Sequence, residues 1–184
     1  MPYKYDSKKS LQQKIESGVD VLTDYVASTL GPRGRNVILQ QKDKRPIITK
    51  DGVTVAKFIN LEDSFENLGA QIIKQASERT ASDAGDGTTT TTVLARAIYK
   101  NAQKYIQAGI SPVELKRGMD KACEKIVENL REKSIPISSM EDIERVATIS
   151  ANGDKHIGKL IAEAVEQAGR DGAITIEEGN SLET

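Results

Sequence analysis

The sequence predicts a mainly α-helical protein that contains one small β element, an α+β fold class. Apolar residues recur every three or four positions over long stretches of the 184-residue chain, which is the period of an amphipathic helix. Between residues 36 and 60 this period is lost, and short β-branched runs are separated by turn residues. A stretch with one proline and three serines at 134–139 interrupts the helical pattern again, so we expect a domain boundary near Ser134.

The composition argues against several classes of protein. The chain has 26 Lys and Arg residues against 27 Asp and Glu residues, so its charge gives no reason to expect nucleic acid or an acidic membrane as a partner. Cys123 is the only cysteine, which excludes an internal disulfide. No stretch approaches a membrane span, and residues 1–10 lack the apolar core of a signal peptide. We therefore expect a cytoplasmic protein without nucleic-acid or membrane partners.

The first part of the chain is expected to form helices around the β element. A helix over 7–30 begins at Asp6 or Ser7 as N-cap and ends at Gly31-Pro32, where glycine and proline follow the last periodic residue. Asp-Gly between apolar runs is a hairpin signal, so Lys50-Asp51-Gly52 is predicted to be a tight turn between strands. The remaining elements expected here are strands at 37–39, 47–49 and 54–59 and helices at 61–82 and about 88–108.

The second part is expected to contain three helices and a final strand. Ser111 as N-cap and Pro112 at the first helical position open a helix to about residue 133. Cys123 lies on its apolar stripe, which indicates a buried structural thiol. His156 lies one step off the stripe of its helix, and a single histidine without partners indicates a surface position. The other elements expected here are helices at 140–150 and 154–168 and a strand at 173–177.

The stretch Gly85-Asp86-Gly87 followed by five threonines has the residues of a phosphate site. Branching at Cβ makes threonine a poor residue for a helix interior, so the threonines indicate the beginning of a helix. A helix N-terminus offers unpaired N–H groups and partial positive charge to an anion. Asp86 is placed to hold the magnesium of a nucleotide. A threonine-rich N-cap without any ligand also explains this stretch taken alone, and the G-x-x-x-x-G-K-[ST] pattern is absent from the chain.

Three turns share this character, and together they resemble one family. The turns are Thr29-Leu30-Gly31-Pro32, Lys50-Asp51-Gly52 and Asp86-Gly87-Thr88-Thr89-Thr90. In this order and spacing they closely resemble the ATP-binding half of the group I chaperonins, the GroEL-like family. The resemblance runs from about residue 10 to the end of the chain. Four further stretches carry it: 48–53 (ITKDGV), 65–71 (FENLGAQ), 148–152 (TISAN) and 158–164 (GKLIAEA).

The resemblance implies a domain organisation and a function. Residues 1–133 would be the N-terminal half of an equatorial, ATP-binding domain, and residues 134–184 the ascending segment of an intermediate domain. The whole protein would be an ATPase that uses ATP to encapsulate and refold unfolded client proteins. It would assemble as a homo-oligomer with seven-fold rings, a tetradecamer when complete, and would bind a co-chaperonin lid.

The resemblance also implies roles for individual residues with ATP, Mg²⁺ and K⁺. Asp86 matches the magnesium-binding aspartate, and Asp51 the carboxylate that positions the attacking water. Thr29 and Lys50 would lie near a bound potassium ion. The remaining residues would line the nucleotide: Thr29, Leu30, Gly31 and Pro32 beside the phosphates; Gly87, Thr88, Thr89 and Thr90 around the β and γ phosphates; and Ile149 and Ser150 near the base and sugar.

The chain departs from the family in two ways. Thr91 stands where the family usually has a small residue, commonly alanine, and we expect one extra methyl and hydroxyl to be tolerated at a helix start. The family's second catalytic aspartate, the rest of its base pocket and its client-binding apical domain would lie beyond residue 184. The predicted strand at 173–177 also has no partner nearby in the sequence, so we expect a piece of something larger.

Two other hypotheses stay open. The chain can be a truncated chaperonin fragment without ATPase activity, acting as a nucleotide-binding or interaction module. It can also be an unrelated kinase or ATPase with a threonine-rich phosphate turn, although that leaves the other matching stretches unexplained.

Overall fold

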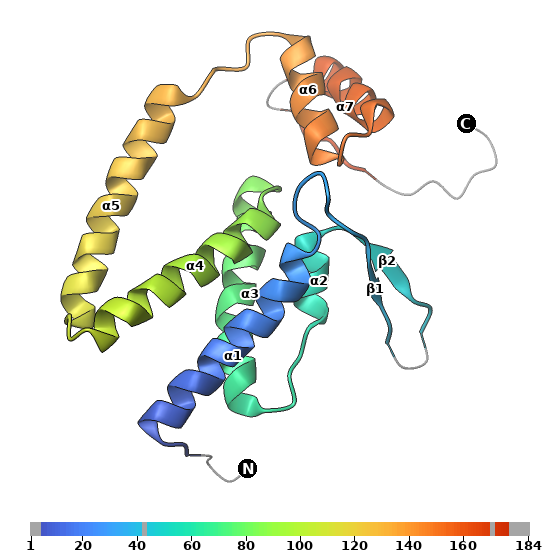
Figure 1. Ribbon diagram of the computed structural model, residues 1–184. Helices are drawn as coiled ribbons and strands as arrows, with labels where there is room; N and C mark the ends of the chain where they lie inside the picture. Colours follow the sequence, from blue (N-terminus) through green and yellow to red (C-terminus); the bar gives the residue numbers. More distant parts are fainter. Residues whose placement is uncertain (1–4, 42–43, 170–171, 177–184) are drawn as a thin grey trace. The chain divides into compact units, whose positions relative to one another are not determined.

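The predicted fold class is confirmed by a computed structural model, which describes residues 5–41, 44–169 and 172–176 (Figure 1). The described part is mostly helical and contains one antiparallel pair of strands. The elements are α1 (Lys8–Ala27), β1 (Val37–Leu39), β2 (Ile47–Thr49), α2 (Gly52–Phe58), α3 (Ser64–Ala84), α4 (Thr88–Gln107), α5 (Pro112–Lys133), α6 (Met140–Ser150) and α7 (Lys155–Ala168).

The chain divides into two compact units, Met1–Ala122 and Cys123–Thr184, and the division falls inside α5. The predicted domain boundary lies at the end of α5 instead, and it stays a prediction. No helix in the described residues is long and apolar enough to cross a membrane.

The core of the first unit is formed where α1, α2 and α3 meet. Figure 1 shows α1, α3 and α4 running side by side, with the β1–β2 hairpin extending away from them. The buried residues of this core come from α1 (Val19, Leu22, Val26), α2 (Val55, Ala56) and α3 (Ala70, Ile73). The α1 residues are spaced three and four positions apart, as on one face of an amphipathic helix, so α1 buries an apolar face.

Two glycines allow α1 and α3 to pack at very short range. A Cβ atom at Gly18 would lie 1.8 Å from the carbonyl oxygen of Glu66, and one at Gly69 would lie 2.0 Å from that of Ile15. Both neighbours are backbone atoms, which cannot move aside independently of their helix. The contact therefore requires glycine on both helices, and it fixes the distance between the two longest elements of the core.

The strand predicted at 54–59 is wrong, because these residues form most of helix α2. Asp51 is its N-cap: Oδ2 accepts from Thr54 N at 2.9 Å and from Thr54 Oγ1 at 2.6 Å. An aspartate before glycine is a signal both for a hairpin turn and for a helix cap. Here the capping bonds, together with burial of Val55 and Ala56 against α1 and α3, outweigh the β preference of the branched residues. The strands at 37–39 and 47–49 are confirmed, with Ile38 opposite Ile48.

Lys74 ties the end of α2 to α3. Its side chain is almost entirely buried, with 6% of the residue exposed, and its Nζ donates to the carbonyl oxygens of Lys57 at 3.2 Å and Ile59 at 2.9 Å. These carbonyls lie at the C-terminus of α2, where a helix leaves acceptors unpaired. Burial lowers the pKa of Lys74, and the nearby Glu78 carboxylate opposes that shift.

The second unit is organised around the pairing of α6 and α7. Ser139 and Asp142 form a reciprocal capping box at the start of α6, and Asp154 caps α7. Gly158 lies against α6, where a Cβ would meet Thr148 Oγ1 at 2.0 Å. The cap bonds lower the pKa of the Asp142 carboxyl, chiefly through the Ser139 hydroxyl.

Three predictions for the second part have definite outcomes. His156 is exposed, as predicted. Cys123 is exposed instead of buried, and helix α5 has no buried residues. The strand predicted at 173–177 is not formed by its described residues 173–176, which pair with no described strand, while Glu177 and residues 178–184 lie outside the described residues.

We expect Gly18→Ala to destabilise the protein, although alanine is the better helix former. The substitution gains about 1 kcal/mol of helix propensity. The added Cβ would overlap the Glu66 carbonyl, so α1 and α3 must separate along the core. The net loss in free energy of unfolding should be about 2 kcal/mol, within the range for overpacked cores. Urea unfolding followed by circular dichroism measures it.

Gly118→Ala is the matched control, since a Cβ at this position of α5 meets nothing within 4 Å. Here propensity acts alone and should raise stability by up to about 1 kcal/mol. Equal effects of the two substitutions would contradict the packing account.

The lowered pKa of Lys74 predicts a stability that rises with pH. In the interval between that lowered pKa and 10.5, the unfolded chain binds more protons at this residue than the folded chain. The free energy of unfolding therefore increases as pH rises through this interval, relative to Lys74→Met, in which all other titrating groups are unchanged. A difference between the two proteins that is flat or falls with pH would overturn this assignment.

Candidate phosphate-binding site

The three turns predicted from the sequence meet at the first turn of α4. Thr29, just after α1, lies with its Oγ1 3.3 Å from Oγ1 of Thr89. Gly52, the first residue of α2, packs so closely there that a Cβ would lie 2.2 Å from Thr89 Oγ1 and 3.2 Å from Thr88 Oγ1. Segments separated by 60 residues, at Thr29 and Thr89, are thus held together by direct contact.

The turn after α1 is folded back on itself. Thr29 is buried, and its hydroxyl donates to the carbonyl oxygen of Val26 at 2.8 Å. Gly31 has φ 72°, a conformation that favours glycine, and its carbonyl accepts from Gly34 N at 2.9 Å. Leu30, Gly31 and Pro32 are exposed, and they lie next to the buried Thr29.

The hydroxyl pair between Thr29 and Thr89 has a defined direction. A threonine hydroxyl has one hydrogen to donate, and that of Thr29 is directed to Val26. Thr89 is therefore the donor in the pair, and Thr29 the acceptor. This fixes the Thr89 side chain against the end of α1.

The turn before α4 is shaped to leave the helix N-terminus open to an anion. Gly85 ends α3 with φ 75°, and Gly87 precedes α4 with φ 88°. Gly87 occupies the N-cap position, and having no side chain it cannot accept from the first N–H groups of the helix. These donors and the positive end of the helix dipole are suited to a phosphate. Thr90 is exposed here, whereas Thr88 is buried with its carbonyl accepting from Thr92 Oγ1.

Two carboxylates lie in these turns. Asp86 is exposed, and its Oδ1 accepts from Gly87 N at 2.6 Å. Asp51 is exposed at the start of α2, next to the Gly52 contact with Thr89. Lys50 precedes it at the end of β2 and is partly exposed. The structure thus brings the segments containing Lys50 and Asp51 to the first turn of α4.

The donor set of this site fits magnesium only if a ligand contributes to it. Among the described residues, no group of three or more His, Cys, Asp or Glu side chains could hold a metal ion. Mg²⁺ accompanying a nucleotide is commonly held by one or two carboxylates together with phosphate oxygens and water. Asp86 alone beside an open helix N-terminus matches that arrangement.

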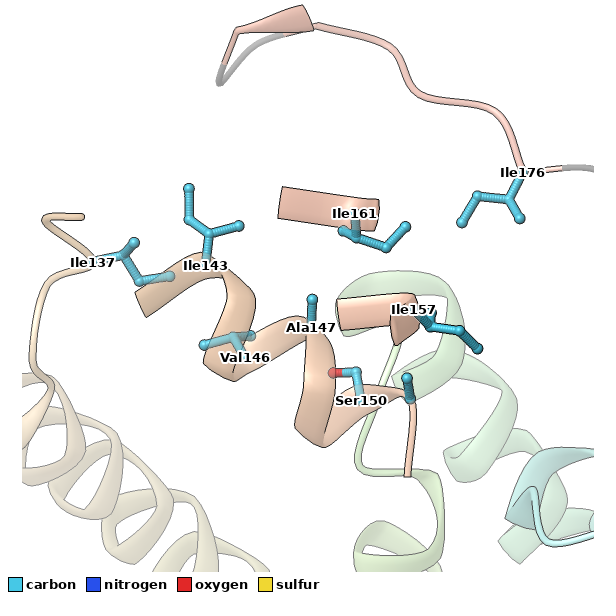
Figure 2. A pocket seen from close by; sticks show the side chains of 9 residues that line it. Ile137, Ile143, Val146, Ala147, Ser150, Ile157, Ile161 and Ile176 are labelled. Carbon is cyan, nitrogen blue, oxygen red and sulfur yellow. The ribbon is translucent and has the colours of Figure 1, made fainter. Parts of the chain in front are cut away.

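Ile149 and Ser150 belong to the second unit, and their part in this site stays a prediction. Both lie at the end of α6, where successive residues point in different directions. Ser150 lines an apolar hollow of about 470 Å³ between α6 and α7, with Ile143, Val146 and Ile161 among its walls (Figure 2). Ile149 is 74% exposed and lines a separate, charged hollow of about 500 Å³ with Glu144 and Lys155.

Sequence reasoning missed two features of the site. Gly52 was predicted as a turn residue, whereas it is the residue of α2 that packs against α4. This close approach depends on tertiary packing, which no local sequence pattern reveals. Thr80 was not singled out, yet its Oγ1 lies 3.0 Å from Thr91 Oγ1 across the α3–α4 turn. No spacing signal marks this pair, because the turn geometry decides which residues face each other.

Comparison with known proteins agrees with the fold and with the family. The model of the TCP-1/cpn60 chaperonin family matches residues 22–183. A group III chaperonin crystallised in the open state is similar over 86% of this chain, with a TM-score of 0.70 and 25% sequence identity. The chaperonin gp146 from the bacteriophage EL 2 (Pseudomonas aeruginosa), crystallised in the presence of ATP-BeFx, is similar over 85% of this chain, with a TM-score of 0.68 and 27% identity.

This chain covers 32% and 28% of the length of these two chaperonins. It therefore corresponds to about a third of the solved proteins that it resembles. The family match extends over most of the chain and includes all three turns. It begins within α1, so the first residues of that helix lie outside it. The chain belongs to the TCP-1/cpn60 chaperonin family.

Proposed function

We propose that this chain binds the phosphates of Mg-ATP as part of an ATP-driven, group I type chaperonin subunit. The observation that carries the proposal is the meeting of Thr29, Gly52 and Thr89 at the open N-terminus of α4. Three chain segments meet there at the first N–H groups of α4, which have no acceptor within their own helix. Such an arrangement suits a polyphosphate, which is large, anionic and rich in acceptors.

Each turn has a distinct role in this proposal. The segment Thr29, Leu30, Gly31 and Pro32 lies along the phosphates, and Gly87, Thr88, Thr89 and Thr90 surround the β and γ phosphates. Asp86 holds Mg²⁺ together with phosphate oxygens. Thr29 and the backbone of Lys50 lie near K⁺, because an oxygen, and not the Lys50 ammonium, is the group that can approach a cation. Ile149 and Ser150 contribute to the base and sugar side.

Asp51 is the catalytic carboxylate of the proposal. It would orient the attacking water, and Mg²⁺ held by Asp86 would supply charge compensation for the phosphates. Phosphoryl transfer depends on positioning and electrostatic stabilisation more than on covalent chemistry. The cap bonds from Thr54 N and Oγ1 hold the Asp51 side chain in one orientation through Oδ2.

The functions of the complete protein are proposed from the family resemblance. They are ATP hydrolysis coupled to encapsulation of unfolded clients, seven-fold rings that pair as a tetradecamer, a co-chaperonin lid, and a cytoplasmic location. A second candidate is a fragment that binds nucleotide or a partner without hydrolysis. It is favoured by exposed apolar side chains on α4, such as Leu94 and Ile98, which a partner could cover.

The proposal predicts that Mg-ATP stabilises the chain through Asp86. A ligand at ~100 times its dissociation constant adds roughly 2.7 kcal/mol to a protein that binds it only when folded. Thermal unfolding with and without Mg-ATP should therefore show a raised transition in the native sequence and none in Asp86→Ala. Asp83→Ala, which removes an exposed carboxylate three residues away on α3, should keep the shift. An equal shift in both variants would refute the role of Asp86.

Asp51→Asn separates the structural role of this residue from its proposed chemical role. Asparagine is an equally good N-cap, so stability should be unchanged, whereas Asp51→Ala should lose about 1 kcal/mol. Turnover of ATP should fall about a hundredfold or more in both variants, in line with loss of a general base. Full turnover in Asp51→Asn would show that this carboxylate only caps α2. A chain that binds Mg-ATP but does not turn it over supports the second candidate.

A further inference from the structure

The turn that carries Asp86 is closed at its base by a pair of threonine hydroxyls. Thr80 is on the penultimate turn of α3 and Thr91 on the first turn of α4, and their Oγ1 atoms are 3.0 Å apart. The hydroxyl of Thr80 donates to the carbonyl oxygen of Ala76 at 3.1 Å. Since each hydroxyl has one hydrogen, Thr91 donates to Thr80.

Thr80 also lies near Gly87 in this turn. The Thr80 methyl Cγ2 lies 3.9 Å from the position that a Cβ at Gly87 would occupy. Thr80 thus borders the space that a side chain at Gly87 would occupy, while its oxygen pairs with Thr91. The short connection Gly85-Asp86-Gly87 is therefore bounded by α3 and α4 at both of its ends.

The first turn of α4 is consequently held from two sides by hydroxyl pairs. Thr89 donates to Thr29 at the end of α1, and Thr91 donates to Thr80 on α3. Residues two positions apart on a helix point in different directions, so the two bonds act on different faces of the turn. Together they restrict both translation and rotation of the helix N-terminus.

We propose that Thr80 and Thr91 are a positioning pair that sets the Asp86 turn and the first N–H groups of α4 for phosphate binding. This inference rests on the proposed function of the site. Neither residue touches the ligand; they act through the turn between them. The extra hydroxyl of Thr91, at the position where the resemblance implies a small residue, has a specific partner in this chain.

A double-mutant cycle on the full 184-residue chain tests the inference. The variants are Thr91→Val, Thr80→Val and the double variant, which remove hydroxyls at nearly constant shape, and Thr91→Ser, which keeps the hydroxyl. Ile73→Val is the control for a general loss of stability, because Ile73 is buried in the core away from the turn. The probes are Mg-ATP affinity by calorimetry and amide hydrogen exchange of residues 85–91.

Loss of the pair should weaken Mg-ATP binding about three- to tenfold, the value of one ordinary hydrogen bond. The two valine variants and their combination should lose similar amounts, because each breaks the same bond. Amides of residues 85–91 should exchange faster by a comparable factor. Thr91→Ser should bind within about twofold of the native sequence, since it retains the bond. Ile73→Val should lose stability without a change in affinity.

Additive losses in the double variant, or native affinity in Thr91→Val, would overturn the inference. If the native sequence itself does not bind Mg-ATP, the proposed function fails for this chain, and hydrogen exchange then decides about the pair. Faster exchange of residues 85–91 in both valine variants, restored in Thr91→Ser, supports the positioning role. Unchanged exchange refutes it.

Discussion

The arrangement of this protein depends on the close contact between the first turn of α4 and the segments that precede it in the chain. Thr89 meets both the end of α1, through Thr29, and the start of α2, through Gly52. Neither contact tolerates much displacement, because one is a hydrogen bond and the other has no room for a Cβ. The core beneath enforces the same spacing through Gly18 and Gly69 on α1 and α3. The packing of these helices therefore also sets the geometry of the candidate site.

The site offers a phosphate the same kinds of interaction as a glycine-rich phosphate loop, but with different residues. An open helix N-terminus, glycine at positive φ and nearby hydroxyls provide donors and partial positive charge. The turn before α4 contains no residue that corresponds to the lysine of the usual phosphate loop. Charge compensation at this site would then come from a bound cation, and Asp86 is the carboxylate in that turn.

Helices with a long apolar period and the two short strands could be predicted from the sequence, whereas helix α2 could not. Val19, Leu22 and Val26 of α1 lie in the core, and Ser7, one of the two predicted N-cap residues, caps this helix. The segment 52–58 has both strand composition and a helix cap, and only its burial against α1 and α3 decides for the helix. Cys123 illustrates the opposite case: periodicity indicates an apolar face, but not whether any element covers it.

The parts of the candidate site could be predicted from local residue patterns, whereas their assembly was expected only from the family resemblance. Each turn was recognisable from small and polar residues, and their meeting at Thr89 follows from tertiary packing. The direction of the hydroxyl bonds and the Thr80–Thr91 pair depend on side-chain geometry, for which the sequence contains no signal. Ile149 and Ser150 line separate hollows of the second unit, so their proposed part in nucleotide binding depends on an arrangement of units that local structure does not determine.

The most direct test of the account is to locate the bound phosphates by NMR. Backbone amide resonances of the isotope-labelled chain would be followed during titration with Mg-ATP and, separately, with Mg-ADP. The account predicts that the largest shifts fall on residues 29–31, 52–53 and 86–90 together, and that residues 88–90 respond more to the triphosphate. Shifts confined to the hollows of α6 and α7, or no specific shifts at saturating nucleotide, would contradict it.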